Sequence, residues 1–317
     1  MHKKNLLLFD GHNVFIRSFI GLMRHDLRSP DGDGTWGVFG AINTIASLVR
    51  KYQPTHVMVA FDSGRSAKRL AIDPEYKANR NRDKDKPKSP TDEIFSEEFK
   101  PQLKDFKLLC TLMGVPFLSI HGTEADDIIA SIALSTHEVF DRVIIVSADH
   151  DLQQLIRNNI IVVKPGISYR DINTEVYDHE AVVNEWGVTP ERLPEIWALM
   201  GDKGDNIKGI KGIGPKKAMK LIAENGDLES VLSLDDPKIA ENIGVVRTAY
   251  SLIKLGYDDS LALPPLGNLQ FNPVGPKDPT AKEVDDALKI LGFEQVRKHW
   301  LSGTLWQDAS NFGRSLR

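Results

Sequence analysis

Aspartate residues stand at the ends of segments that the sequence predicts to be buried β-strands. They are Asp10, Asp62, Asp149 and Asp151. Because the carboxyl ends of parallel strands meet at one edge of a sheet, these four side chains are expected to converge there. A single aspartate after a strand is commonly a turn former, so it is their convergence that indicates a site.

A second acidic group opens a predicted helix. Glu124, Asp126 and Asp127 fall within four residues, directly after Thr123. Thr123 is a plausible helix cap, and acids in a first helical turn are favourable by about 0.3–1 kcal/mol each, so a structural role stays open for one or two of them. Placed beside the strand-end aspartates, however, three more carboxylates would repel them unless cations lay between.

The candidate ligand atoms are all oxygens, which favours Mg²⁺ or Mn²⁺ over zinc. His150 stands between two of the aspartates. Because no His or Cys partner lies nearby in the sequence, we interpret it as a spacer or a neighbour of the ligands.

A glycine-rich basic run follows a further acidic pair, Asp202 and Asp205. The run contains Lys208, Gly209, Lys211, Gly212, Gly214, Lys216 and Lys217. A glycine turn between helices exposes backbone amides to a phosphate, and lysine in a first helical turn opposes the helix dipole unless an anion is bound. A solvated lysine face is the alternative that stays open here.

The apolar pattern predicts an α/β fold. Short β-branched runs predict strands at residues 5–9, 55–61, 116–120, 142–147 and 159–164. Helical spacing predicts helices at residues 38–51, 99–113, 124–134 and 152–157. This alternation is typical of a parallel sheet with crossover helices. Residues 64–91 carry many charges and few apolar side chains, which indicates a surface insertion.

From about residue 180 the chain is predicted to be mostly helical. The expected helices are at residues 190–200, 216–224, 228–232, 245–255 and 281–291, with an irregular connection at residues 264–277. We therefore expect an α/β domain over residues 1–180, with the insertion at about 64–100. A helical domain with a C-terminal extension is expected over residues 181–317, with the glycine turn and its helices at about 196–225.

Composition narrows the class of protein. The 317 residues include 44 Asp and Glu against 40 Lys and Arg, a net charge of −4, which argues against a protein that coats nucleic acid by bulk charge. The one cysteine, Cys110, lies in a helical apolar pattern and is expected to be a buried thiol in a reducing compartment. No apolar run is long enough to span a membrane, so a cytoplasmic location is expected, in the host cytoplasm if a phage encodes the chain.

Six motifs, taken in order, resemble those of the 5′ nuclease family of flap endonucleases, 5′-3′ exonucleases and polymerase-linked 5′ nuclease domains. They are Leu8-Phe9-Asp10-Gly11, Phe61-Asp62, Glu75-Tyr76-Lys77-Ala78-Asn79-Arg80, Glu124-Ala125-Asp126-Asp127, Asp149-His150-Asp151, and the stretch from Gly201 to Gly214. The resemblance covers roughly residues 5–260 and is closest to the stand-alone bacteriophage-type enzymes. It implies a PIN-like, resolvase-like core, a helical arch formed by the insertion, and a helix-three-turn-helix (helix-hairpin-helix) that grips duplex DNA.

The resemblance also implies roles for individual residues. One metal site would use Asp10, Asp62, Glu124, Asp126 and Asp127, and the other Asp149, Asp151, Asp202 and Asp205. Lys77 and Arg80 match positions whose cations reach the scissile phosphate. Arg65, Arg69, Tyr76 and the seven residues of the glycine-rich run would contact DNA. The implied cofactors are two Mg²⁺ ions, with Mn²⁺ as a substitute, and K⁺ at the hairpin.

These implications predict hydrolysis of DNA by two metal ions about 4 Å apart, leaving a 5′-phosphate and a 3′-hydroxyl. The expected substrate is branched or gapped DNA with a 5′ single-stranded end, or an RNA primer, in replication, primer removal or repair. The chain would act as a monomer, with a DNA polymerase as a separate partner. Two alternatives stay open: a Mg²⁺ phosphohydrolase with Asp149 and Asp151 as its aspartate pair, and a non-catalytic DNA-binding relative.

The sequence departs from the family at two places. Relatives usually carry an aromatic residue near the first aspartate that stacks on a base, whereas Ile16 occupies the matching place here, between Phe15 and Phe19. Lys208 stands where many relatives have proline. The sequence leaves open which side chain near Asp10, if any, stacks on a base.

Overall fold

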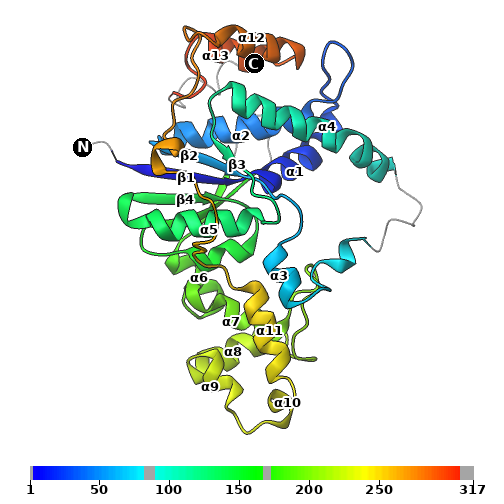
Figure 1. Cartoon of the computed structure of the whole chain (residues 1–317), viewed down its shortest axis with the longest axis vertical. Coiled ribbons are helices and arrows are strands. Elements are labelled where there is room, and N and C mark those ends of the chain that lie inside the picture. The colour runs from blue at the N-terminus through cyan, green and yellow to red at the C-terminus, as the bar shows by residue number, and fades with distance from the viewer. Residues whose placement is uncertain (1–2, 82–89, 167–172, 308–317) are drawn as a thin grey trace.

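The computed structural model describes residues 3–81, 90–166 and 173–307. A six-stranded sheet runs through it, in the strand order β3-β2-β1-β4-β5-β6 (Figure 1). The strands are β1 (Asn5–Asp10), β2 (His56–Ala60), β3 (Phe117–Leu118), β4 (Arg142–Val146), β5 (Ile160–Pro165) and β6 (Thr174–Tyr177). The first five are parallel, as predicted. Strand β6 is antiparallel and was not predicted, because its four residues are only partly buried at the edge of the sheet.

Both faces of the sheet are buried, which explains why its strands are nearly continuous apolar runs. Alternate residues of a strand point to opposite faces. In β1, Leu6 and Leu8 join one hydrophobic cluster, while Leu7 and Phe9 join a second. The first cluster also contains residues of α5 (Ala125–Thr136), and the second contains residues of α1 (Gly11–Leu22), α2 (Trp36–Tyr52) and α4 (Pro90–Leu112).

Helix α1 was missed in the sequence because its first residues, Gly11-His12-Asn13, carry no apolar pattern. Its start is fixed by Asp10, whose carboxylate accepts a hydrogen bond from the Asn13 N–H (3.0 Å). The helix expected at residues 152–157 is a short 3-10 helix, η4 (His150–Leu155).

The predicted insertion contains more regular structure than its charge pattern indicated. It includes α3 (Ala67–Ile72) and the 3-10 helix η2 (Ala78–Asn81), and α4 begins at Pro90 rather than at residue 99. The remainder of the insertion, residues 82–89, lies outside the described residues.

The helical region fills the lower part of Figure 1. Its helices are α6 (His179–Trp186), α7 (Leu193–Met200), α8 (Pro215–Asn225), α9 (Leu228–Leu232), α10 (Pro237–Ala240) and α11 (Ile243–Ile253). Helices α6 and α10 were not predicted. Within the ranges that the structure describes, no helix combines the length and the apolar character needed to cross a bilayer.

The C-terminal helices α12 (Ala281–Ile290) and α13 (Glu294–Leu301) lie at the other end of the molecule from α8–α11, although the sequence analysis grouped them together (Figure 1). The chain returns along the sheet, where the Phe271 N–H donates to the Thr55 carbonyl (2.9 Å). Trp300 is buried in the cluster of α2 and α4, and its indole N–H donates to the Val274 carbonyl (2.8 Å). The last two helices therefore complete the core on the α2 side of the sheet.

We predict that Trp300→Ala destabilises the whole protein, because it removes a large side chain that is 1% exposed. The expected loss is about 3–5 kcal/mol, measured by chemical denaturation. Ile290→Ala is the control, since Ile290 is 63% exposed on α12 and should change stability by less than about 0.5 kcal/mol. Equal effects of the two substitutions would contradict this packing.

Candidate metal centre and DNA-binding cleft

The carboxylates expected at the strand ends do converge at the carboxyl edge of the sheet. Asp126, in the first turn of α5, is in the middle of the group. Burial raises the pKa of Asp126 well above its usual value, and Asp149, Asp10, Asp151 and Asp62 raise it further. Mutual repulsion of this kind requires close neighbours, so residues that are distant in the sequence form one cluster of negative charge.

Asp10 is held in this cluster by hydrogen-bond donors. Besides the bond from Asn13, its Oδ2 accepts a hydrogen bond from the Ser147 hydroxyl (2.9 Å). Burial raises the pKa of Asp10 to about 7, with further contributions from Asp62 and Asp149. Ser147 was not singled out from the sequence, where its position just after β4 is the only signal for its role.

Asp149 and Asp151 form the second part of the cluster. Asp149 accepts a hydrogen bond from the Asp151 N–H (3.0 Å) at the start of η4. Ligand atoms of Asp149, His150 and Asp151 lie within 4.8 Å of one another. Burial, followed by the charge of Asp149, raises the pKa of Asp151 to about 7. The His150 ring also meets Trp197 edge to face, at 5.1 Å between centroids.

Asp62 differs from the other strand-end acids because its side chain is 44% exposed. One oxygen accepts a hydrogen bond from the Ala125 N–H at the start of α5 (2.8 Å), and the other lies 3.3 Å from His12 Nδ1. Burial lowers the pKa of His12 in spite of the nearby Asp62 carboxylate. The sequence analysis did not single out His12.

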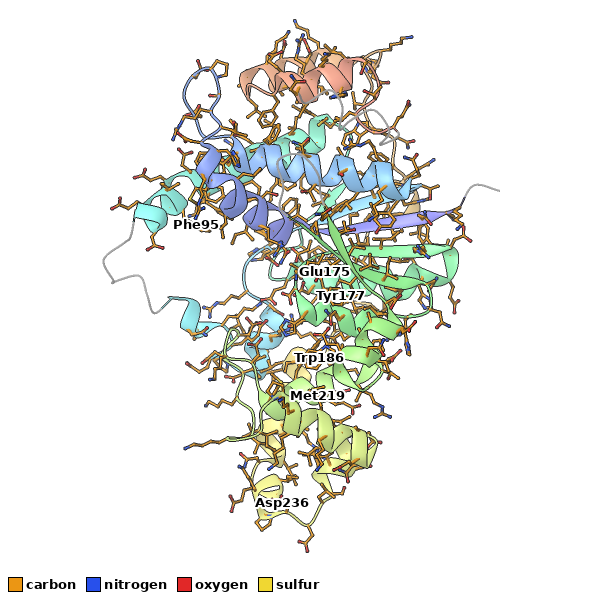
Figure 2. The ribbon with its side chains drawn as sticks, turned by 180° about the vertical axis from the view of Figure 1, so that it is seen from behind. Phe95, Glu175, Tyr177, Trp186, Met219 and Asp236 are labelled. Carbon is orange, nitrogen blue, oxygen red and sulfur yellow. The ribbon has the colours of Figure 1, made fainter. Side chains whose placement is uncertain are left out.

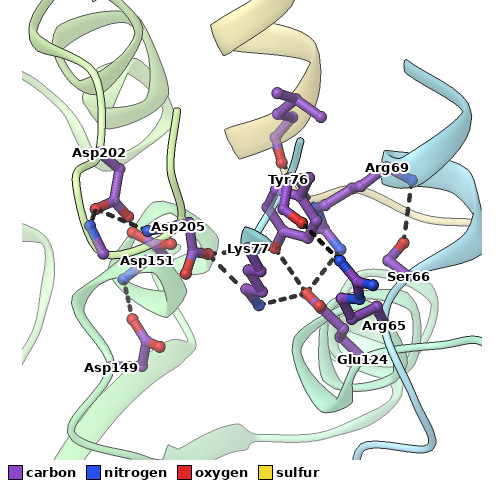
Figure 3. Close-up of polar contacts among 12 residues, drawn as sticks. Arg65, Ser66, Arg69, Tyr76, Lys77, Glu124, Asp149, Asp151, Asp202 and Asp205 are labelled. Carbon is purple, nitrogen blue, oxygen red and sulfur yellow. Dashed lines mark hydrogen bonds and ion pairs between the residues drawn. The ribbon is translucent and has the colours of Figure 1, made fainter. Parts of the chain in front are cut away.

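Lys77 lies between two of the predicted metal ligands, Glu124 and Asp205 (Figure 3). Its Nζ is 2.9 Å from Glu124 Oε2 and 3.4 Å from Asp205 Oδ2. The Tyr76 hydroxyl lies within hydrogen-bond distance of the same two carboxylates, at 2.9 and 3.2 Å. Asp202, at the start of the same turn as Asp205, accepts a hydrogen bond from the Gly204 N–H (2.7 Å).

Three residues with predicted site roles have partners within the protein in this structure. Tyr76 was expected to contact DNA, but it is 2% exposed within the first hydrophobic cluster. Arg69, also expected on DNA, is 6% exposed and binds Asp127 through two nitrogens (2.6 and 3.0 Å). Arg69 Nη1 also contacts Glu124 (3.2 Å), and its Nε donates to the Leu252 carbonyl (2.8 Å). Because a buried charge needs a partner, Asp127 is the counter-ion of Arg69 in this structure rather than a member of the Asp126 cluster.

The two phenylalanines near Asp10 cannot stack on a base in this structure. Phe15 and Phe19 are fully buried in an aromatic group with Phe99 and Phe95 of α4. Figure 2 labels Phe95 on this helix. Ile16 is partly buried. The place where relatives carry a stacking aromatic is thus occupied by an aliphatic side chain.

In the part of the insertion that the structure describes, Arg65 places an exposed cation near this site. Its guanidinium donates to the Tyr76 carbonyl (3.4 Å). Arg80 has its backbone in η2, but its side chain lies outside the described part of the chain.

A cleft of about 1070 Å³ extends from Asp151 and Asp202 along the glycine-rich basic run. Gly209 allows the run to pass close to the end of α7, because a Cβ atom there would collide with the backbone of Met200 and Gly201. Gly212 has a φ of +79°, which favours glycine. The run therefore forms a tight turn that lines the cleft.

Helix α8 begins in this cleft just after Gly214, with no side-chain cap and no acid in its first turn. Pro215 has no N–H group and the Lys217 N–H donates to the Gly214 carbonyl (3.1 Å), so it is the positive end of the helix dipole that makes an anion favourable here. Four exposed lysines surround the turn, and none forms an ion pair within the described residues. They are Lys208, Lys211, Lys216 and Lys217.

Two family models match consecutive parts of this chain. A family model described as the 5′-3′ exonuclease N-terminal resolvase-like domain matches residues 5–187, and one described as the 5′-3′ exonuclease C-terminal SAM fold matches residues 188–264. The chain is 35% identical over 229 residues to a 5′-3′ exonuclease of Aquifex aeolicus, covering 72% of each chain. It is 36% identical over 245 residues to DNA polymerase I of Mycobacterium tuberculosis, covering 77% of this chain but 25% of the polymerase.

Among solved structures, the T5 5′-exonuclease with bound zinc has a similar fold, with a TM-score of 0.66 and 23% identity. The match covers 95% of this chain and 98% of the T5 chain. The sheet with its carboxylate edge belongs to the first matched family region, and the basic turn with α8 belongs to the second. Because the two models together account for residues 5–264, this chain belongs to the 5′-3′ exonuclease family.

Proposed function

We propose that this chain is a structure-specific 5′ nuclease, with 5′-3′ exonuclease and 5′-flap endonuclease activity, that hydrolyses DNA with two divalent cations. The observation that carries the proposal is the buried carboxylate cluster around Asp126, which opens beside the cleft lined by the basic turn. Family membership supports it. A T5 protein of similar fold, described as a flap endonuclease, is known in a complex with DNA and metal ions.

The donor set fits hard divalent cations, because apart from His150 the cluster offers only carboxylate oxygens, whose mutual repulsion a cation would relieve. We propose Mg²⁺, with Mn²⁺ as a substitute. One ion would be held by Asp10, Asp62, Glu124 and Asp126, and the other by Asp149, Asp151, Asp202 and Asp205. Two such ions supply a water-derived hydroxide at neutral pH and stabilise the leaving oxygen.

The side chains of the chain itself orient and stabilise the phosphodiester. Lys77, between Glu124 and Asp205, supplies positive charge where negative charge develops on the phosphate in the transition state. Arg80 is proposed for the same role. No side chain is needed as a nucleophile, and the products carry a 5′-phosphate and a 3′-hydroxyl.

Two grips would select the structure of the substrate. The exposed lysines and free amides of the turn before α8 would hold the duplex backbone, with K⁺ bound at the turn carbonyls. The insertion, with Arg65 at its base, would contact the single-stranded 5′ end. We propose branched or gapped DNA as the substrate, an RNA primer as a further one, and a monomer that works beside a separate DNA polymerase in replication or repair.

Metal binding and pH are expected to act together on the stability of the fold. Asp10 and Asp151 have a pKa of about 7 in the folded chain, above the ordinary 3.8, so the metal-free fold loses stability as pH rises from about 4 to 7. Bound cations should reverse this loss. In calorimetry, Mn²⁺ at about 100 times its Kd should raise the Tm by about 5 °C at pH 8, and much less at pH 5.

Asp126→Asn is the matched variant for this measurement. It removes one buried charge from the cluster, so it should melt at a higher temperature than the wild type in metal-free buffer at pH 8, yet respond weakly to Mn²⁺. A wild-type Tm that is indifferent to Mn²⁺ at pH 8 would contradict the proposed metal centre.

The second group of carboxylates is expected to be essential for DNA cleavage. The double substitution Asp149→Asn with Asp151→Asn should slow Mg²⁺-dependent cleavage of a 5′-flap duplex by at least about 10³-fold in a gel assay, because it removes two metal ligands. Asp235→Asn, an exposed aspartate of the helical region, is the control and should cleave at the wild-type rate. Cleavage that persists in chelator would contradict the two-metal proposal, whereas release of phosphate from a small ester with no action on the flap would favour the phosphohydrolase alternative.

The lysines of the basic turn are expected to bind the phosphates of duplex DNA. Lys211→Ala with Lys216→Ala should weaken duplex binding and lower the slope of log K against log salt by about 2, because two phosphate contacts are lost. Lys282→Ala with Lys298→Ala, on α12 and α13, removes equal charge from the other end of the molecule. If both pairs change the salt slope equally, the basic turn is not a specific grip.

A further inference from the structure

Two asparagines tie the base of the insertion to the turn after α7. Asn79 reaches from η2 into this turn, and Asn206 reaches back from the turn to the insertion. The hydrogen bonds run from Asn79 Nδ2 to the carbonyls of Lys203 (2.8 Å) and Gly204 (3.2 Å), from Asn206 Nδ2 to the carbonyl of Glu75 (2.7 Å), and from the Lys77 N–H to the carbonyl of Asp205 (2.9 Å). We name these four hydrogen bonds the asparagine clasp.

The clasp encloses two residues with unusual backbone geometry. Of the four non-glycine residues with positive φ in the described part of the chain, two are Lys77 (φ 56°) and Asn206 (φ 60°). Asparagine tolerates this left-handed region, whereas for lysine it costs about 1–2 kcal/mol. Such a conformation persists only where the surroundings hold it, and the clasp binds the backbone at Glu75 and at Lys77 itself.

This backbone geometry determines where the Lys77 ammonium lies. The side chain is 11% exposed, and Nζ lies between Glu124 and Asp205, on carboxylates from two different elements (Figure 3). Lys77 therefore contacts Asp205 twice, with its backbone N–H on the carbonyl and its ammonium on the carboxylate. A change in φ at Lys77 would break both contacts.

Hydrogen bonds fix the orientation of the Asn79 side chain. Its amide nitrogen donates to two carbonyls, while its Oδ1 is buried and has no hydrogen-bond partner among the residues that the structure describes. Both hydrogen bonds end on the turn that carries Asp205, so they fix the half-buried Asn79 against that turn. The residue also lines the cleft between the carboxylates and the basic turn.

We propose that Asn79 and Asn206 are positioning residues that act through Lys77, holding its ammonium in register with the Asp202–Asp205 turn. This inference rests on the proposed nuclease function and adds to it a link between the base of the insertion and the second group of carboxylates. Loss of the clasp should slow the chemical step while leaving duplex binding intact, because the basic turn is built by other residues.

The test is a double-mutant cycle in single-turnover cleavage of a 5′-flap duplex, with enzyme in excess and saturating Mg²⁺. Asn79→Ala should slow cleavage by about 10–100-fold, since a misplacement of about 1 Å costs about that much. In a Lys77→Ala background the same substitution should have almost no further effect. The Asn79→Ala variant should bind duplex DNA with the same dissociation constant as the wild type.

Two more variants separate positioning from folding. Asn206→Gly removes the amide but accepts positive φ readily, so it should keep the wild-type Tm and still slow cleavage. Asn242→Ala removes a comparable bond, from Asn242 Nδ2 to the Lys238 carbonyl (2.8 Å), far from Lys77, and should leave cleavage unchanged. Independent, multiplicative effects of Asn79→Ala and Lys77→Ala, or equal loss of rate in Asn242→Ala, would overturn the proposal.

Hydrogen exchange gives a readout that does not require activity. In the metal-free protein without DNA, Asn79→Ala should speed exchange of the Lys77 amide by at least about tenfold, with residues 208–214 unchanged. Unchanged protection at Lys77 would refute the clasp. If the wild type cleaves no flap substrate but this exchange result is obtained, the proposed function fails while the structural coupling stands.

Discussion

Burial of several carboxylates side by side is the constraint around which this protein is built, because burial is the main cause of their raised pKa values and mutual repulsion adds to it. A pKa of about 7 in place of 3.8 at Asp10 and at Asp151 corresponds to on the order of 4 kcal/mol for each group above neutral pH, against a typical domain stability of about 5–15 kcal/mol. The fold offsets part of this cost with helix N-termini: Asp10 caps α1, Asp149 caps η4, and Asp62 accepts the first N–H of α5.

Cations of the chain divide the carboxylates into two groups. Glu124 and Asp205 contact Lys77, and Asp127 binds Arg69. Asp10, by contrast, is held by uncharged donors, and the pKa of Asp126 is raised by four surrounding acids. The negative charge that the protein leaves uncompensated is therefore concentrated beside the cleft, where divalent cations would be most strongly attracted.

The sequence predicted the fold class well because buried parallel strands are continuous apolar runs that end at acidic residues. It failed where stability depends on distant contacts. Residues 281–291 show helical spacing, but that pattern predicted neither helix α13 nor the packing of both C-terminal helices on α2 and α4. The sequence predicted Asp127 as a metal ligand and Arg69 as a DNA contact, but only the structure shows that they bind each other, because spacing along the chain does not specify which of several charges become paired.

The structure also indicates how the two proposed DNA-binding regions, the basic turn and the insertion, would act at one centre. The basic turn and the Asp202–Asp205 turn are consecutive in the chain, so the duplex grip and the second group of carboxylates move together. The insertion is distant in the sequence from both turns. Its position would not depend on theirs if the sheet were the only connection between them. Hydrogen bonds between residues 75–79 and residues 203–206 remove that independence. Under the proposed function, a strand bound by the insertion would be placed in a fixed relation to a duplex bound by the turn, and DNA that makes both contacts would bring a phosphodiester to the carboxylates.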